Sequence, residues 1–337
     1  MAINVAVNGF GRIGRDALRI LVDNDAFNCV AVVSTTDDSK TMRHLFKYDS
    51  VSGGYKNGEV VAKDKALEVN GKEIKLIKGT NPKEVDWKGL GVDIVIECSG
   101  KYRKRDDAAV FLDAGAKKVV VSAPCKQADA TIVMGINEKI YDKDNHNVIS
   151  NASCTTNCLA PVVKVMLENF GIKKGMMTTV HAYTRDQMLL DSRHKKDLRR
   201  ARAAALSMIP TTTGATEAVG LVIPEVKGKL NGIAIRVPVA DVSIVDLALE
   251  IEKSTTPEEI NETFKEASET YLKGILQYCD EPLVSADFIG NSYSSIFDSL
   301  LTDVIDGNFV KVFSWYDNEW GYANRLVDLT QYVGEKL

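Results

Sequence analysis

The stretch "INVAVNGFGRIGRDALRI", residues 3–20, decides the fold of the first part of the chain. An apolar, strand-like run leads directly into Gly9, Gly11 and Gly14, which have the G-x-G-x-x-G spacing, and a helical pattern follows them. Glycines at this spacing let the backbone turn sharply and approach a pyrophosphate, whose charge meets the free N–H groups of the helix. The stretch therefore predicts a dinucleotide-binding turn.

Apolar strand-like runs then alternate with helical ones, as in "CVAVV" (29–33), "VDIVIE" (92–97) and "KKVVV" (117–121). Strands that are apolar on both faces predict a parallel sheet covered by helices. After about residue 175 the strands alternate in character, and in "GIAIRVPVADVSIVDLALEIEK" Ile233, Ile235, Val237 and Val239 share one face. This pattern is typical of a mostly antiparallel sheet with one packed face. The predicted class is α/β, a Rossmann-type domain plus an α+β domain.

Two helices show clear signals at their ends. Thr256, Pro257 and Glu259 form a capping box with proline at the first helical position. The final helix is expected to turn its apolar residues inward and to stop at Gly334. These inward residues are Ala323, Leu326, Val327 and Val333.

Length and composition narrow the class of protein. The chain has 337 residues, enough for about two domains of ~150 residues each. Its composition is 45% hydrophobic and 26% charged, and its net charge of -4 gives no general reason to bind nucleic acid or anionic membrane. No apolar run reaches the ~20 residues of a membrane span, and the start has no basic-then-apolar signal. We expect a cytoplasmic protein with six reduced cysteines.

The stretch "NASCTTNCLAP" raises the question of what Cys154 and Cys158 do. Cys154 is predicted at a helix N-terminus with Asn151 or Ser153 as cap, a position that lowers a thiol pKa. Pro161 predicts a kink or a restart within this helix. Cys158, one turn further, is expected to be buried and inert. A zinc site is disfavoured because no second Cys/His cluster lies nearby, so we expect no metal.

A thiolate nucleophile needs a base, and His181 in "MMTTVHAYT" lies on a predicted strand. A lone strand histidine is more often structural. The hydroxyls of Thr184 and Thr213, the N–H of Gly214 and the guanidinium of Arg236 are groups that phosphate oxygens require. For Arg236, periodicity alone favours a solvated sheet face.

The second strand ends in Ser34 and Thr35, where NAD-specific sites usually carry an acidic residue. The missing carboxylate removes the main obstacle to a 2′-phosphate and so favours NADP. Asp37 and Asp38 follow closely, which keeps NAD open as the cofactor.

Several motifs occur in order along essentially the whole chain: "NGFGRIG", "FKYDS", "SNASCTTNCLAP", "TTVHAYT", "DLRRARAAA", "IPTTTGA", "SSIFD" and "SWYDNEWGY". Together they resemble phosphorylating glyceraldehyde-3-phosphate dehydrogenase. The resemblance implies a homotetramer that uses NAD or NADP, glyceraldehyde 3-phosphate and inorganic phosphate. It implies an NAD(P)-binding domain at 1–153 and 318–337 and a catalytic domain at 154–317.

The same resemblance implies roles for individual residues. Cys154 would attack the aldehyde, and His181 would take the proton and orient the oxyanion. The phosphate groups would be bound by Ser153, Thr155, Thr184, Arg200, Thr213, Gly214 and Arg236. The cofactor would be bound by Gly9, Gly11, Arg12, Ile13, Gly14, Ser34, Ser99, Ser122, Arg193 and Asn318.

Some positions depart from the family pattern. Val33-Ser34 replaces the usual Asn-Asp, and Ser192-Arg193 replaces the usual Leu-Pro and is followed by one extra residue. Because both replaced pairs exclude a 2′-phosphate in NAD-specific members, we expect NADP use, alone or alongside NAD, with Arg193 as a counter-charge. Glu217 stands where lysine is common, and Lys78 and Thr80 do not reproduce the usual adenine-side arginine.

Two alternatives differ from this interpretation. An erythrose-4-phosphate dehydrogenase shares "SCTTN" but lacks "HAYT" and "TTTGA", which are both intact here. A catalytically silent relative that senses redox state or binds RNA is disfavoured because Cys154, His181 and Arg236 are all present.

Overall fold

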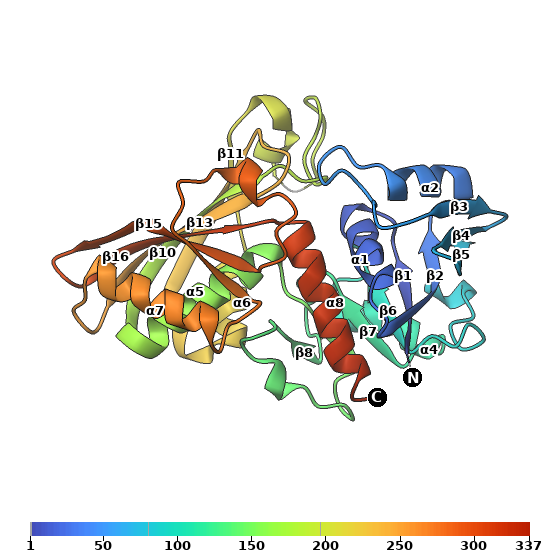
Figure 1. The fold of residues 1–337 in the computed structure, drawn as a ribbon, viewed down its shortest axis with the longest axis horizontal. Helices are drawn as coiled ribbons and strands as arrows, with labels where there is room; N and C mark the ends of the chain where they lie inside the picture. The colour runs from blue at the N-terminus through green and yellow to red at the C-terminus, as the bar shows by residue number, and fades with distance from the viewer. Residues whose placement is uncertain (1, 80, 196) are drawn as a thin grey trace. The chain divides into compact units, whose positions relative to one another are not determined.

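The computed structural model describes residues 2–79, 81–195 and 197–337 (Figure 1). Thr80, one of the departures from the family pattern, lies outside the described residues. The chain divides into two compact units. The first contains the residues up to Met134, then Glu138–Ser153 and Ala323–Leu337, and the second contains Gly135–Asn137 and Cys154–Tyr322.

The first unit is built on a nine-stranded sheet in the order β3-β4-β5-β2-β1-β6-β7-β9-β8. Its strands are β1 (Ile3–Asn8), β2 (Phe27–Ser34), β3 (Val60–Lys63), β4 (Ala66–Val69), β5 (Lys72–Lys78), β6 (Ile94–Glu97), β7 (Lys118–Val121), β8 (Ala130–Thr131) and β9 (Val148–Ser150). β3, β4 and β5 pair antiparallel at one edge, and every other pairing in the sheet is parallel. The predicted parallel sheet is confirmed, because strands that are apolar on both faces need cover on both sides.

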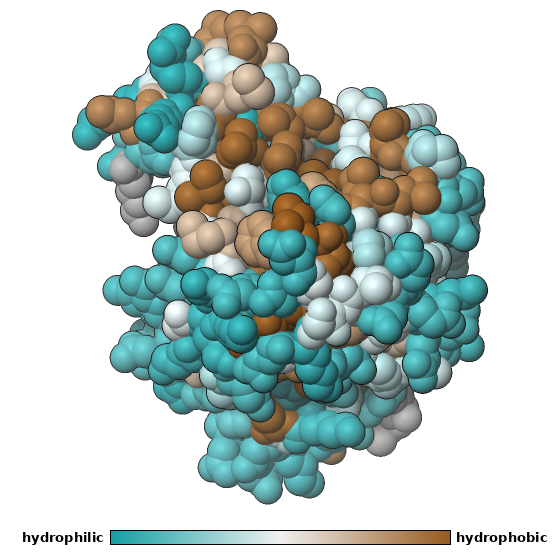
Figure 2. All heavy atoms as spheres, turned by 90° about the vertical axis from the view of Figure 1, so that its left-hand side faces the viewer, coloured by the Kyte–Doolittle hydropathy of each residue, from teal (hydrophilic) through white to brown (hydrophobic). Residues whose placement is uncertain are grey.

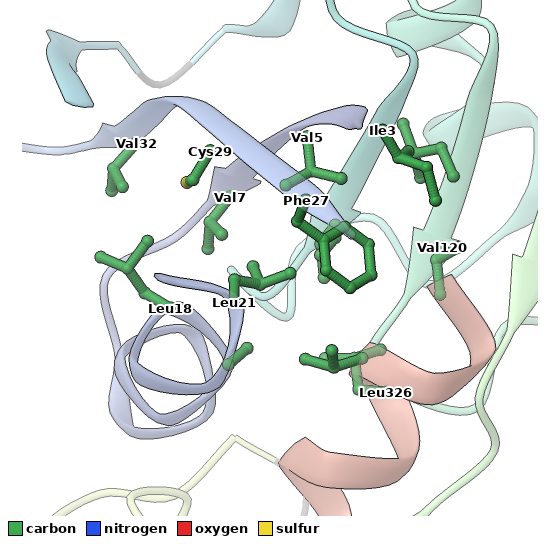
Figure 3. Close-up of a cluster of buried hydrophobic side chains, with 14 of the residues drawn as sticks. Ile3, Val5, Val7, Leu18, Leu21, Phe27, Cys29, Val32, Val120 and Leu326 are labelled. Carbon is green, nitrogen blue, oxygen red and sulfur yellow. The ribbon is translucent and has the colours of Figure 1, made fainter. Parts of the chain in front are cut away.

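Helices supply the cover of this sheet. They are α1 (Arg12–Val22), α2 (Ser39–Lys47), α3 (Arg105–Ala108), α4 (Val110–Asp113) and the later part of α8 (Trp320–Gly334), with short 3-10 turns η1 (Pro82–Glu84) and η2 (Glu138–Ile140). Leu18 and Leu21 of α1 lie against Val7 of β1 in one buried cluster that also contains Leu326 of α8 (Figure 3). Each fully buried side chain of this size contributes ~1.5–3 kcal/mol, so the cluster fixes α1 and its glycine turn on the sheet.

The second unit is built on a seven-stranded sheet in the order β11-β12-β10-β13-β16-β15-β14. Its strands are β10 (Ile172–Ala182), β11 (Ile209–Thr212), β12 (Leu230–Val237), β13 (Ser243–Ile251), β14 (Leu276–Cys279), β15 (Ser295–Ile305) and β16 (Phe309–Tyr316). β10 with β12 and β14 with β15 pair parallel, and the remaining pairs are antiparallel. The predicted mostly antiparallel sheet is therefore confirmed.

The helices of the second unit are α5 (Cys154–Phe170), α6 (Ala215–Val222) and α7 (Pro257–Glu269), with short turns η3 (Arg199–Ala201), η4 (Ala204–Leu206), η5 (Pro224–Val226) and η6 (Ser285–Phe288). α7 begins with the predicted capping box of Thr256 and Glu259. The restart expected at Pro161 is wrong, since α5 is assigned as one helix from Cys154 to Phe170. Most of its residues are buried, and this packing offsets the hydrogen bond lost at the proline.

The face of the seven-stranded sheet that carries Ile233 was expected to be the packed face, and this expectation is wrong at Ile233. Ile233 is 49% exposed, whereas the neighbouring Ala234, on the opposite face, is buried. Met176 of β10 is likewise 65% exposed. Figure 2, which views the molecule from the left-hand side of Figure 1, shows apolar side chains gathered on the upper half of the surface. The sheet thus carries apolar residues on a face that this chain leaves uncovered.

Among the described residues, no helix is long and apolar enough to cross a membrane. All six cysteines lie in the described part of the chain and are free thiols.

Candidate active site

The glycine turn of the first unit leaves room for a ligand at one position and none at the other two. Gly9 has φ +109°, and a Cβ there would lie 2.6 Å from the backbone nitrogen of Ser99. A Cβ on Gly14 would lie 2.0 Å from the carbonyl oxygen of Gly9. At Gly11, by contrast, nothing lies within 4 Å of an added Cβ. Gly9 and Gly14 are thus required by the turn itself, and Gly11 keeps the space above it open.

The open side of this turn suits an anion. Gly11 is the N-cap of α1 and has no side-chain cap, so the first N–H groups of the helix have no capping side chain. Free N–H groups and the positive end of the helix dipole together bind phosphate oxygens. Gly9, Gly11 and Gly14 therefore fit the pyrophosphate of a dinucleotide.

Arg12 is held by a buried carboxylate. Its Nη1 donates to both carboxylate oxygens of Asp49, at 2.8 and 2.7 Å, and Arg19 lies 3.4 Å from the same carboxylate. Burial would raise the pKa of Asp49, but the hydrogen bonds from Arg12 and from the N–H groups of Val51 and Ser52 lower it well below its usual range. This ion pair fixes the Arg12 side chain at the start of α1.

A buried carboxylate that the sequence analysis missed organises the loop beside the glycine turn. Glu97 ends β6 and is 1% exposed, and it accepts hydrogen bonds from Asn8 Nδ2, from Ser99 N (2.8 Å) and from Gly100 N (3.1 Å). Burial raises the pKa of Glu97, and these bonds oppose that shift. Ser122 N donates to the Glu97 carbonyl at 2.9 Å. The signal for this carboxylate was a charged residue that ends an otherwise apolar strand.

Side-chain hydrogen bonds to nearby backbone groups order the residues that follow β2. Ser34 Oγ donates to the carbonyl of Thr36 at 2.6 Å, and its register partner on β5 is Lys78. Asp38, one of the two aspartates that keep NAD open as the cofactor, caps α2 by accepting from Lys40 N. The described residues thus place a hydroxyl and a lysine, rather than a carboxylate, at neighbouring strand ends.

In the second unit the thiol and the imidazole meet. Cys154 is the first residue of α5, and His181 is near the end of β10. Cys154 Sγ lies 3.5 Å from His181 Nε2, within the range of a hydrogen bond to sulfur. His181 is 2% exposed and lies on β10, so the packing around the strand restricts the motion of its ring. The predicted cysteine-histidine pair is confirmed.

Arg236 also joins this pair, against the expectation from periodicity. The parallel pairing of β10 and β12 sets His181 opposite Arg236. Arg236 Nη1 lies 2.8 Å from His181 Nδ1 and donates to the carbonyl of Ala182 at 3.0 Å. The solvated sheet face expected for this arginine is wrong, because the guanidinium turns toward the reacting groups.

The electrostatics of the pair differ from expectation in one respect. Burial raises the pKa of the Cys154 thiol, although Arg236, Thr155 and the N–H groups at the start of α5 lower it. The predicted net lowering of the thiol pKa is wrong because desolvation outweighs the helix terminus. Burial and then Arg236 lower the pKa of His181 to about 3, so the imidazole is neutral and can accept a proton.

The His181 ring has two possible tautomers. Nδ1 lies 2.7 Å from the carbonyl of Ala182, so a proton on Nδ1 leaves Nε2 free to take the proton of Cys154. The other tautomer accepts from Arg236 at Nδ1 and directs its Nε2 proton at the sulfur. The position of the Arg236 guanidinium therefore influences whether His181 is a base.

Tyr316 lies behind the pair and was missed by the sequence analysis. Its hydroxyl lies 2.9 Å from the hydroxyls of both Thr155 and Thr179, and its ring makes an edge contact with His181. Cys158 is fully buried near Ser314, and burial raises the pKa of its thiol to about 12. Cys158 is accordingly a packing residue, as its position one helical turn after Cys154 suggested.

Arg200 lies in a second group of polar residues. Its Nε donates to Thr211 Oγ1 at 2.9 Å and its Nη2 to the carbonyl of Thr212 at 3.3 Å. Thr213 Oγ1 accepts from Ala215 N, at the start of α6. These contacts bring Arg200 to the strand that leads into Thr213 and Gly214. Arg193 is exposed, and Thr184 is half-buried.

Asn318 follows β16. Its Oδ1 accepts a hydrogen bond from Ser243 Oγ at 2.6 Å. Within the described ranges, no group of three or more His, Cys, Asp or Glu side chains is placed to hold a metal ion.

Comparison with known proteins agrees with this geometry. Residues 3–105 match the family model of the glyceraldehyde 3-phosphate dehydrogenase NAD binding domain, and residues 153–318 match that of the C-terminal domain. The chain is 57% identical to glyceraldehyde-3-phosphate dehydrogenase of Geobacillus stearothermophilus, covering 100% of this chain and 99% of the relative. Glyceraldehyde-3-phosphate dehydrogenase 1 of Bacillus subtilis strain 168 is 55% identical over 100% of this chain and 99% of its own length. Glyceraldehyde-3-phosphate dehydrogenase 2 of the same strain is 51% identical over 100% of this chain and 98% of its own length.

Proposed function

The chain belongs to the glyceraldehyde-3-phosphate dehydrogenase family, whose reaction converts glyceraldehyde 3-phosphate to 1,3-bisphosphoglycerate, and we propose that this enzyme accepts NADP as well as NAD. We further propose that Cys154 is its nucleophile and His181 its general base. The observation that carries these roles is the 3.5 Å separation of Cys154 Sγ and His181 Nε2.

In the first step, the sulfur of Cys154 forms a bond to the aldehyde carbon, and its proton passes to Nε2 of His181. The imidazolium then returns this proton to the new alkoxide oxygen, which gives the neutral hemithioacetal and leaves Nε2 free again. Because the thiol and the imidazole lie so close together, the charges created by the proton transfer stabilise each other. A bound nicotinamide would supply the acceptor for the hydride that leaves the hemithioacetal carbon. His181 takes the hydroxyl proton in the same step, which leaves a thioester on Cys154.

In the second step, an oxygen of inorganic phosphate attacks the thioester carbon and the sulfur leaves as a thiolate. The product is an acyl phosphate. We assign the substrate's own phosphate to Thr184 and Arg236, and the attacking phosphate to Ser153, Thr155, Arg200, Thr213 and Gly214. Arg236 drawn toward a phosphate would leave His181 Nδ1 free to donate to Ala182, so substrate binding itself would favour the basic tautomer.

The cofactor would lie on the glycine turn. Gly9, Gly11 and Gly14 fit its pyrophosphate, with Arg12 and Ile13 at the start of α1. Ser99 and Ser122 would form the walls around the cofactor, and Asn318 would hold the nicotinamide carboxamide.

Acceptance of NADP is supported by the end of β2. Ser34 provides a hydroxyl where a carboxylate would repel a 2′-phosphate, and Lys78 is its neighbour in the sheet register. Asp38 is occupied as the cap of α2 and is therefore a poor substitute for the missing carboxylate. We assign Arg193 as a further counter-charge. The measurement that tests this is kcat/KM for each cofactor. A preference for NAD of more than about a hundredfold contradicts it.

We also propose a homotetramer with a cytoplasmic location, divided into the NAD(P)-binding and catalytic domains predicted above. The uncovered apolar face of the second unit supports assembly, because exposed apolar patches mark contact surfaces. Leu189 and Leu198, in the segment that also contains Arg193, are more than 80% exposed and support a contact there as well. Sedimentation analysis at micromolar concentration tests the assembly, since a monomer contradicts it.

Erythrose 4-phosphate is the alternative substrate. Initial rates with both sugar phosphates, each with and without inorganic phosphate, separate the two activities. Rates that depend on phosphate and are higher with glyceraldehyde 3-phosphate support the assignment. A Cys154→Ser variant should lose turnover with either substrate.

A further inference from the structure

Ser243, the first residue of β13, connects two parts of the second unit. It is 1% exposed, and its Oγ accepts a hydrogen bond from the backbone N–H of Ala182 at 3.1 Å. The same oxygen donates to Oδ1 of Asn318 at 2.6 Å. One buried hydroxyl thus links the residue after His181 to Asn318.

The chemistry of these three groups sets the orientation of the Asn318 amide. A backbone N–H can only donate, so Ser243 Oγ must act as the acceptor toward Ala182. The hydroxyl keeps its own proton, and in the structure that proton is donated to Oδ1 of Asn318. The amide oxygen of Asn318 therefore faces Ser243, and its NH2 group, two donors, faces away from it.

The segment around Ser243 is held in a costly backbone conformation. Val242 has φ +66° and is buried, although a β-branched residue rarely adopts positive φ. Asp241 on its other side is buried, and the nearby charge of Asp317, the residue before Asn318, adds to burial in raising the pKa of its carboxyl. The corner at residues 241–243 therefore reaches Asn318 through the Ser243 hydroxyl and places a second carboxyl near the charge of Asp317. Such strain persists where the surrounding contacts determine the conformation, and it is concentrated at functional sites.

The backbone next to Asn318 is fixed independently. Asp317 accepts hydrogen bonds from the N–H groups of Gly290 (2.7 Å), Glu319 (2.9 Å) and Trp320 (2.6 Å). With the main chain held in this way, rotation of the amide is the remaining freedom of Asn318. Ser243 removes that freedom.

We propose that Ser243 is a positioning residue that holds the Asn318 amide as a hydrogen-bond donor toward the carboxamide oxygen of the nicotinamide. This proposal rests on the proposed role of Asn318 as the carboxamide ligand. Without the Ser243 hydroxyl, the amide can present its oxygen or its NH2 group to the cofactor. Part of the binding free energy is then spent on selecting the productive orientation.

The test is cofactor affinity, measured by calorimetry on the whole enzyme with NAD⁺ and with NADP⁺. Ser243→Ala should raise the Kd of either cofactor about five- to tenfold, the value of one lost hydrogen bond. Ser243→Thr keeps the hydroxyl and should restore most of the affinity. The KM for glyceraldehyde 3-phosphate and the alkylation rate of Cys154 should change less than twofold.

A matched control separates this effect from the general loss of a buried hydroxyl. Ser295 lies in the same sheet, is fully buried, and has its Oγ 2.7 Å from Ser314 Oγ. Ser295→Ala should lower the melting temperature comparably but leave the Kd of the cofactor unchanged. If Ser243→Ala and Ser295→Ala weaken binding equally, the positioning role is overturned.

Asn318→Ala distinguishes the inference from the assignment on which it rests. If Asn318→Ala leaves the Kd unchanged, the proposed role of Asn318 is wrong. If Asn318→Ala raises the Kd but Ser243→Ala does not, the positioning role alone is wrong. In the double variant, Ser243→Ala should add no further loss of affinity to that of Asn318→Ala.

Discussion

The guanidinium of Arg236 lies against the imidazole of His181, with Nη1 2.8 Å from Nδ1. The two side chains meet because their residues are register partners on the parallel strands β10 and β12. The fixed positive charge disfavours a second cation on the ring and favours a negative charge on the sulfur of Cys154. The arginine proposed to bind substrate thus also adjusts both reacting groups before substrate arrives.

Replacing Arg236 with leucine should therefore slow the chemistry of the free thiol. Without the guanidinium, the pKa of Cys154 rises further above its usual value, and less thiolate is present at neutral pH. We expect the rate of Cys154 alkylation by iodoacetamide at pH 7 to fall several-fold, with its pH midpoint moving upward. Arg202→Leu is the control, because Arg202 pairs with Asp191 on the surface. An unchanged alkylation rate in Arg236→Leu would show that the guanidinium has no such influence.

In the glycine turn, Gly14→Ala should lower stability, whereas Gly11→Ala should weaken cofactor binding without lowering stability. In Gly14→Ala the new Cβ meets the Gly9 carbonyl at 2.0 Å, so the turn must move and the melting temperature should fall by several degrees. In Gly11→Ala the Cβ meets no atom of the chain, so stability should be preserved. The methyl group would instead occupy the space proposed for the pyrophosphate and raise the Kd of NAD⁺ at least tenfold. Calorimetry and thermal melts on both variants check this, and equal stability of the two would contradict it.

The features predicted from sequence were those coded locally. The glycine turn is fixed by strand, turn and helix within residues 3–20, and the capping box of α7 lies within four residues. The pairing of Cys154 with His181 was expected from motifs, and the structure confirms it at 3.5 Å.

The features missed depend on contacts between distant residues. Periodicity along β12 placed Arg236 on a solvated face, since nothing in that strand reveals that its neighbour carries His181. Ile233 was expected on the packed face because it is apolar, but it is exposed. Alternation shows which residues share a face of a strand and does not show what covers that face. Glu97 and Tyr316 were missed because each makes a hydrogen bond to a residue far away in the sequence, Glu97 to Asn8 and Tyr316 to Thr155.

Cofactor preference should respond to a carboxylate at the end of β2. In Ser34→Asp, the new negative charge would repel a 2′-phosphate and accept hydrogen bonds from ribose hydroxyls. We expect the ratio of kcat/KM for NADP to that for NAD to fall at least tenfold. Thr35→Asp is the control, because it adds the same charge at the next residue, which is exposed. It should change the ratio less than Ser34→Asp does. A ratio that does not move in Ser34→Asp would place the 2′-position elsewhere.

Asp241 should make the protein less stable as the pH rises. Burial, followed by the charges of Asp317 and Glu319, raises the pKa of Asp241 from 3.8 to about 9. Between these values the folded state holds a proton that the unfolded state has lost. The free energy of unfolding therefore falls by up to ~1.4 kcal/mol per pH unit. In Asp241→Asn, a neutral amide that does not titrate replaces the carboxyl group near Asp317, so this part of the slope should disappear and stability at pH 8 should rise.

Urea unfolding at pH 6, 7 and 8, at one protein concentration, measures this slope. Asp246→Asn is the matched control, because Asp246 lies on β13, in a partly exposed ion pair with Lys311, and its replacement is the same change from a carboxyl group to an amide. The control should keep the wild-type slope, since it leaves Asp241 and its surroundings unchanged. If Asp241→Asn also keeps that slope, Asp241 is ionised in the folded protein and the expectation is wrong.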